Sequence, residues 1–67
     1  MTTEERKYLV SRVEFTQRMV DRLNAICADA KLFKNSEFAS LKEVRAERVM
    51  YEDILLFDKR ELRGSAA

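Results

Sequence analysis

Hydrophobic residues recur at alternating spacings of four and three along the first half of the chain. An α-helix has about 3.6 residues per turn, so this spacing brings them to one side of a helix. Thr2 and Glu5 form a capping-box pattern at its start. The pattern predicts a helix over about residues 3–31 with one continuous apolar seam. The seam consists of Leu9, Val13, Thr16, Val20, Leu23, Cys27 and Ala30.

A second apolar row runs beside this seam, and Arg12 and Arg22 interrupt it. Its members are Tyr8, Phe15, Met19 and Ile26. The apolar surface of the first helix is therefore wider than one neighbouring helix can easily cover. We expect the second row to pack on a partner chain or on another copy of this one.

The second half of the chain predicts another helix, over about residues 38–63, with two apolar stripes. One stripe contains Phe38, Leu41, Val44, Tyr51, Leu55 and Leu62, and the other contains Ala46, Met50, Ile54 and Phe57. Arg48 and Asp58 interrupt the first stripe. The two stripes merge between residues 49 and 57, so a two-helix hairpin alone would leave much of this surface in water.

Between the two helices, the segment from 32 to 37 predicts a short turn. Asn35 tolerates the left-handed conformation that ends a helix, and Ser36 and Ser40 are both suitable N-cap residues. Gly64 suggests that the second helix stops there and that residues 64–67 fray. The prediction is a single all-α domain over residues 1–67, an antiparallel two-helix hairpin with coiled-coil-like packing.

Composition indicates how such a hairpin is stabilised. The chain has 67 residues with one cysteine and no histidine, so neither an intrachain disulfide nor an ordinary zinc site can form. Chains this short rarely stabilise themselves with one core. We therefore expect the hairpin to complete a bundle, either by dimerisation or by packing on a helical-repeat partner.

Charge and motifs exclude several function classes. Thirteen basic and 12 acidic residues nearly cancel, so nucleic acid is not expected as a partner. Without histidine or a glycine-rich phosphate loop we expect no catalytic, cofactor or metal site, and no enzyme activity.

Cys27 lies on the apolar seam, where a thiol behaves as a small hydrophobe. The polar start and the short apolar runs predict no signal peptide and no membrane span, hence a cytoplasmic protein.

A wider pattern covers about residues 15–60. Thr16-Gln17 lies in an amphipathic first helix, and Glu37-Phe38 lies two residues ahead of Ser40-Leu41. A charged stretch from 42 to 48 then leads to the apolar run Ile54-Leu55-Leu56-Phe57. In these features the chain resembles the small co-chaperones of type III secretion needle subunits, which are helical hairpins.

The resemblance implies a protein-binding function. Such a hairpin would stabilise a tetratricopeptide-like partner chaperone, and the pair would keep the needle subunit soluble in the cytosol. The expected partner contacts are Tyr8, Phe15, Met19, Ile26, Ile54 and Phe57.

Two alternatives remain open from the residues themselves. One is a homodimeric four-helix bundle that binds RNA or regulates, with Arg12, Arg18 and Arg22 presented on one face. The other is a small phage-type inhibitor that docks on a host protein.

Overall fold

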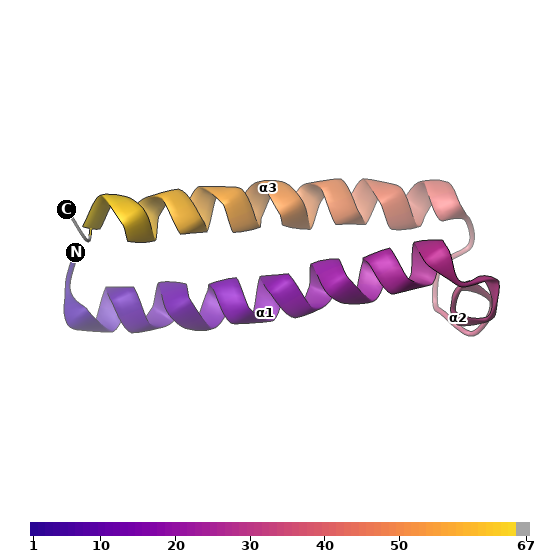
Figure 1. Ribbon diagram of the computed structural model, residues 1–67, viewed down its shortest axis with the longest axis horizontal. Coiled ribbons are helices and arrows are strands. Elements are labelled where there is room, and N and C mark those ends of the chain that lie inside the picture. The colour runs from indigo at the N-terminus through magenta and orange to yellow at the C-terminus, as the bar shows by residue number, and fades with distance from the viewer. Residues whose placement is uncertain (66–67) are drawn as a thin grey trace.

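The computed structural model describes residues 1–65 and contains two long helices and a short one. Helix α1 spans Thr3–Ala28, α2 spans Ala30–Lys34 and α3 spans Leu41–Ser65. Helices α1 and α3 run antiparallel, α2 lies at one end, and the start of α1 and the end of α3 lie together at the other (Figure 1). The predicted all-α antiparallel hairpin is therefore confirmed.

The start of α1 follows the capping chemistry that its sequence predicts. Thr2 is the N-cap, and its side-chain oxygen accepts a hydrogen bond of 3.1 Å from the backbone amide of Glu5. Glu4 and Glu5 place two carboxylates in the first turn. Negative charge there interacts favourably with the positive end of the helix dipole. The first helix thus begins where expected.

The end of α1 differs from the expected boundary at residue 31. Asp29 has an extended backbone, with φ −127° and ψ 114°, and ends α1 after Ala28. Its carboxylate accepts a hydrogen bond of 2.9 Å from the backbone amide of Lys31, so Asp29 also caps α2. Because an aspartate side chain can satisfy the first amides of a new helix, it favours a break here.

The connection between the long helices is consequently longer than the predicted turn over 32–37. Asn35 has φ −91° and ψ 3°, and no described residue has a positive φ, so the left-handed turn expected at Asn35 was wrong. Instead, α2 makes the first part of the connection. The Ser36 hydroxyl then donates a hydrogen bond of 2.6 Å to the Phe33 carbonyl and accepts one from the Phe38 amide.

Helix α3 starts at a cap centred on Ser40. The Ser40 hydroxyl accepts a hydrogen bond from the Glu43 amide, and the Glu43 carboxylate accepts one from the Ala39 amide. This arrangement is close to the capping box, shifted by one residue on the carboxylate side. Gly64 does not stop the helix as expected, since α3 continues to Ser65 without a left-handed glycine. The remainder of the expected frayed tail, 66–67, lies outside the described residues.

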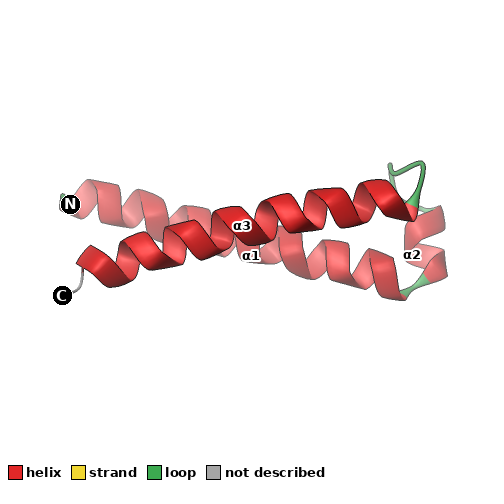
Figure 2. Cartoon of the chain, turned by 90° about the horizontal axis from the view of Figure 1, so that it is seen from above, coloured by secondary structure: helices red, strands yellow, loops and turns green. Residues whose placement is uncertain are grey.

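The core is small and lies along the line where α1 and α3 meet. The two helices cross at a shallow angle near their middles (Figure 2). Leu23 and Val44 are completely buried, and Val20, Ile26 and Leu55 are nearly so. Phe33 from α2 and Phe38 from the following loop pack against the cluster of Leu23, Ile26 and Val44. The hairpin is therefore best covered at its connected end.

Candidate protein-binding surface

The two flanks of the hairpin differ sharply in chemistry. Successive residues of a helix point about 100° apart, so the neighbours of a core residue point to opposite flanks. Because α1 and α3 are antiparallel, the residue that precedes a core position points to the same flank in both helices. Phe15 precedes the buried Thr16 on α1, and Ile54 precedes the buried Leu55 on α3. The apolar rows of the two helices therefore form one surface.

We call this surface the apolar flank. It comprises Tyr8, Phe15, Met19, Met50, Ile54 and Phe57. Tyr8 is 65% exposed, Phe57 is 60% exposed and Phe15 is 56% exposed. Met19 and Ile54 are half-buried at its inner edge. Three large aromatic side chains thus remain mostly in water along one flank.

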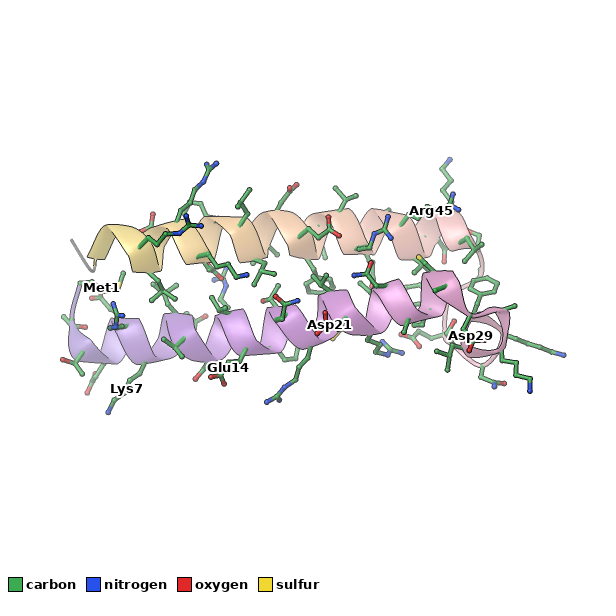
Figure 3. All side chains as sticks on the ribbon, viewed as in Figure 1. Met1, Lys7, Glu14, Asp21, Asp29 and Arg45 are labelled. Atoms are coloured by element: carbon green, nitrogen blue, oxygen red, sulfur yellow. The ribbon has the colours of Figure 1, made fainter. Side chains whose placement is uncertain are left out.

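The opposite flank carries mostly polar side chains, several of which bind one another, together with exposed aliphatic residues such as Val10 and Leu56. Its members include Gln17, Asp21, Asn24, Arg45, Arg48, Glu52, Leu56 and Lys59. Gln17 donates a hydrogen bond of 3.0 Å to Asp21. Arg48 reaches across the hairpin to donate a hydrogen bond of 3.3 Å to Asn24. Figure 3 shows Lys7 and Glu14 pointing away from α3, which leaves the outer edge of α1 charged as well.

A groove at the open end of the hairpin joins the two rows of the apolar flank. It has a volume of about 550 Å³. Its apolar lining residues are Met1, Tyr8, Leu9 and Phe57. Glu4, Glu5, Arg12, Asp58 and Glu61 complete the lining. Tyr8 from α1 and Phe57 from α3 therefore border the same depression.

Asp58 is the buried charge beneath this groove. Its side chain is 1% exposed, and its Oδ2 lies 2.8 Å from Nε of Arg12, which is 41% exposed. Neither carboxylate oxygen accepts a well-oriented hydrogen bond from the described residues. The Asp58 charge is thus balanced by Arg12 as an ion pair.

Arg22 makes a second ion pair, at the connected end. Its Nη2 donates to both oxygens of Glu37, at 2.8 and 3.0 Å. The hydrogen bond from Arg22 lowers the pKa of Glu37, and the same bond raises the pKa of Arg22. Both groups are exposed, so solvent screens the pair. The contact nevertheless links α1 to the loop that leads into α3.

The structure places five of the six expected partner contacts on the apolar flank. The sixth, Ile26, is 5% exposed and belongs to the core cluster, so it cannot contact a partner in this fold. Phe33 and Phe38 pack against its cluster at the connected end. Met50, 47% exposed, belongs to the flank although it was not among the expected contacts. Its position one turn before Ile54 was the signal for it.

The arginines expected on one face for RNA binding are largely engaged within the chain. Arg12 pairs with Asp58 and Arg22 pairs with Glu37. A phosphate backbone would have to compete with these carboxylates for both guanidinium groups. The intrachain pairing of these arginines therefore does not favour the RNA-binding alternative.

Other chemistry is sparse across the described chain. In residues 1–65, no group of three or more histidine, cysteine, aspartate or glutamate side chains is arranged to hold a metal ion. Cys27 is half-buried and packs against the core cluster. No helix in the same range combines the length and apolar character needed to cross a membrane.

Comparison with protein-family models, with curated proteins and with solved structures gives no match to this chain.

Proposed function

We propose that this chain is a non-enzymatic protein-binding hairpin that covers its apolar flank with an α-helical partner. The observation that carries this proposal is the row of Tyr8, Phe15 and Phe57, each more than half exposed on one flank. Large apolar patches on a soluble protein typically mark interaction sites. Aromatic side chains are also the residues that most often dominate binding energy at protein interfaces.

The chemistry of the flank favours a helical ligand over an extended peptide. The two rows lie on the antiparallel helices α1 and α3, so together they form a long, shallow surface. Neither helix offers a strand edge with which an extended peptide could pair. A partner helix lying along the apolar flank would place apolar residues at helical spacing against Phe15, Met19 and Ile54. Burying one such side chain fully contributes about 1.5–3 kcal/mol.

The resemblance over residues 15–60 makes the proposal more specific. In this form the chain is a cytosolic co-chaperone that stabilises a tetratricopeptide-like chaperone and helps to keep a type III secretion needle subunit soluble. Helical-repeat proteins offer extended concave surfaces built from helix pairs. Such a surface fits a hairpin whose one flank is apolar and whose other flank is polar.

The proposal is tested by placing a photo-crosslinking amino acid at Phe15 or at Phe57 in the native cell. Leu56 is the matched control, because it is an apolar α3 residue, 48% exposed, on the opposite flank. We expect crosslinks from positions 15 and 57 to a tetratricopeptide-like protein, and none from position 56. The purified partner should then bind the chain, and Phe57→Glu should abolish that binding while Leu56→Glu preserves it.

Two results would count against the proposal. Equal crosslinking from positions 56 and 57 would show that the apolar flank is not the binding surface. A partner without helical repeats, found reproducibly at positions 15 and 57, would remove the co-chaperone role but keep the protein-binding function.

A further inference from the structure

We infer that a second copy of this chain covers the apolar flank when no other protein is bound, with the two-fold axis parallel to the helices. Helix α1 of each copy then lies against α3 of the other, and the four helices form a bundle. The inference rests on the proposed function in that it uses the same flank. It goes further by naming the second copy and its orientation.

The size of the flank is sufficient for such a dimer. The Cα positions extend over 43 × 15 × 15 Å. A face 43 Å long and 15 Å wide covers on the order of 600 Å² on each copy, so a pair buries on the order of 1,200 Å², the lower limit for a specific interface. Side chains extend beyond the Cα positions, which enlarges the covered area. The flank also carries the large exposed aromatic residues that such an interface needs.

The charges along the flank decide the orientation. On α1 the charged members beside Phe15 and Met19 are basic, Arg12 and Arg22, whereas Glu4 lies one turn before Tyr8 at the open end. On α3 they are acidic, namely Glu43, Glu47 and Glu61. Opposite charges therefore come closer together when α1 of one copy lies against α3 of the other, where each arginine would be shared between a carboxylate of its own copy, Asp58 or Glu37, and one of the second copy. A two-fold axis perpendicular to the helices would instead bring α1 against α1 and α3 against α3, which places like charges side by side.

The heights of these charges along the hairpin also match to within about one helical turn. Within one copy Arg12 contacts Asp58, which lies one turn before Glu61, and the charge of Glu47 acts on Arg22. A two-fold rotation about an axis parallel to the helices leaves every residue at its own height. Glu61 of the second copy is then about one turn closer to the open end than Arg12 of the first, and Glu47 of the second copy lies near the level of Arg22 of the first. Phe15, Met19, Ile54 and Phe57 lie between these two charged levels.

The same rotation aligns the aromatic residues. Arg12 lies one turn before Phe15 and contacts Asp58, which directly follows Phe57. Phe15 and Phe57 therefore lie within one helical turn of each other along the axis of the hairpin. Phe15 of each copy therefore lies opposite Phe57 of the other. Met19 and Ile54 fill the adjacent level, where the flexible Met19 side chain can adapt to its neighbours.

Sedimentation equilibrium of the purified chain tests whether a second copy covers the apolar flank. We expect a dimer, and we expect Phe57→Glu to raise its dissociation constant at least about tenfold, which corresponds to about 1.4 kcal/mol. Leu56→Glu on the opposite flank should leave the constant unchanged. A monomeric wild-type chain would overturn the inference while leaving the proposed function intact, since crosslinking in the cell tests that separately. A dimer that tolerates Phe57→Glu but not Leu56→Glu would overturn the choice of flank.

Disulfide trapping tests the orientation. In a Cys27→Ala background, Phe15→Cys and Phe57→Cys are made as separate variants. We expect each alone to give little disulfide-linked dimer, and the mixture to give a linked heterodimer, because position 15 of one copy faces position 57 of the other. Efficient linking within the Ile54→Cys variant alone, with none in the mixture, would show the perpendicular axis and overturn the proposed orientation.

Discussion

Arg12 and Asp58 bind each other across the hairpin, with Nε of the arginine 2.8 Å from Oδ2 of a carboxylate that is almost completely buried. The pair joins the N-terminal half of α1 to the C-terminal half of α3 beneath the groove of the apolar flank. A buried carboxylate is costly without a compensating charge. The pair thus links the two helices at the open end, where the apolar core contributes little.

Arg12→Met should therefore destabilise the hairpin. The substitution keeps much of the side-chain volume but leaves the Asp58 carboxylate buried without its counter-charge. Because Arg12 itself is partly exposed, we expect a loss of about 1–3 kcal/mol in the free energy of unfolding, measured by urea denaturation. Combining it with Asp58→Leu should recover most of this loss, since apolar residues often replace a buried ion pair without cost.

Arg18→Met is the control for this experiment. Arg18 is an exposed α1 residue, and exposed substitutions of this kind usually change stability by less than about 0.5 kcal/mol. Equal losses for Arg12→Met and Arg18→Met would show that the ion pair does not contribute.

Leu23→Ala should be the most damaging truncation in the core. Leu23 is completely buried against Ile26 and Val44, and the core has few other members. Removing a buried leucine side chain typically costs about 2–5 kcal/mol. We expect a clear fall in the thermal midpoint followed by circular dichroism at the helix band. Leu32→Ala, at a position 45% exposed on α2, should shift the midpoint far less.

Asp29→Ala tests the break between α1 and α2. The variant loses the acceptor for the Lys31 amide, and loss of an N-cap costs about 0.5–2 kcal/mol. We expect faster hydrogen exchange at the Lys31 amide, with the Glu43 amide unaffected. Ser40→Ala should give the converse pattern, because Ser40 binds the Glu43 amide. Unchanged exchange at Lys31 in Asp29→Ala would argue that α2 is held by other contacts.

The Arg22–Glu37 pair gives the chain a defined response to acid. The hydrogen bond from Arg22 lowers the pKa of Glu37 in the folded state below its usual value of 4.5. The folded state therefore gains stability from this carboxylate above pH 4.5 and loses it as the pH falls through the lowered pKa. Glu37→Gln should accordingly reduce the dependence of unfolding free energy on pH in that acidic range.

Glu14→Gln is the comparison for that titration, because Glu14 has no ion pair within 1–65 and points away from α3. Denaturation curves collected from neutral to acidic pH provide the measurement. Parallel curves for Glu37→Gln and the wild-type chain would contradict the assignment.

Local signals in the sequence were sufficient for the helices and for two of their caps. Thr2 and Ser40 bind amides three residues ahead, so neighbouring residues alone determine these contacts. Asp29 was missed because the apolar seam continues past it, through Cys27 to Ala30. There, the capping preference of one side chain outweighs the helical pattern around it.

The contacts between the helices needed the structure. Arg12 and Asp58 appear in the sequence only as interruptions of apolar rows, and their pairing depends on the register of α1 against α3. That register is set by the connection, which contains a helix where a tight turn was expected. Ile26 lies in the cluster with Leu23 and Val44, against which Phe33 and Phe38 pack, instead of facing a partner.

The position of residues 1 and 65 has a practical consequence for design. The start of α1 and the end of α3 both lie at the end of the hairpin opposite α2 (Figure 1). In the proposed dimer the ends of both copies would therefore lie near one another. A short flexible linker from residue 65 of one copy to residue 1 of the next would not have to span the 43 Å length of the molecule. The tandem chain would fold as a single-chain four-helix bundle whose thermal midpoint is independent of concentration.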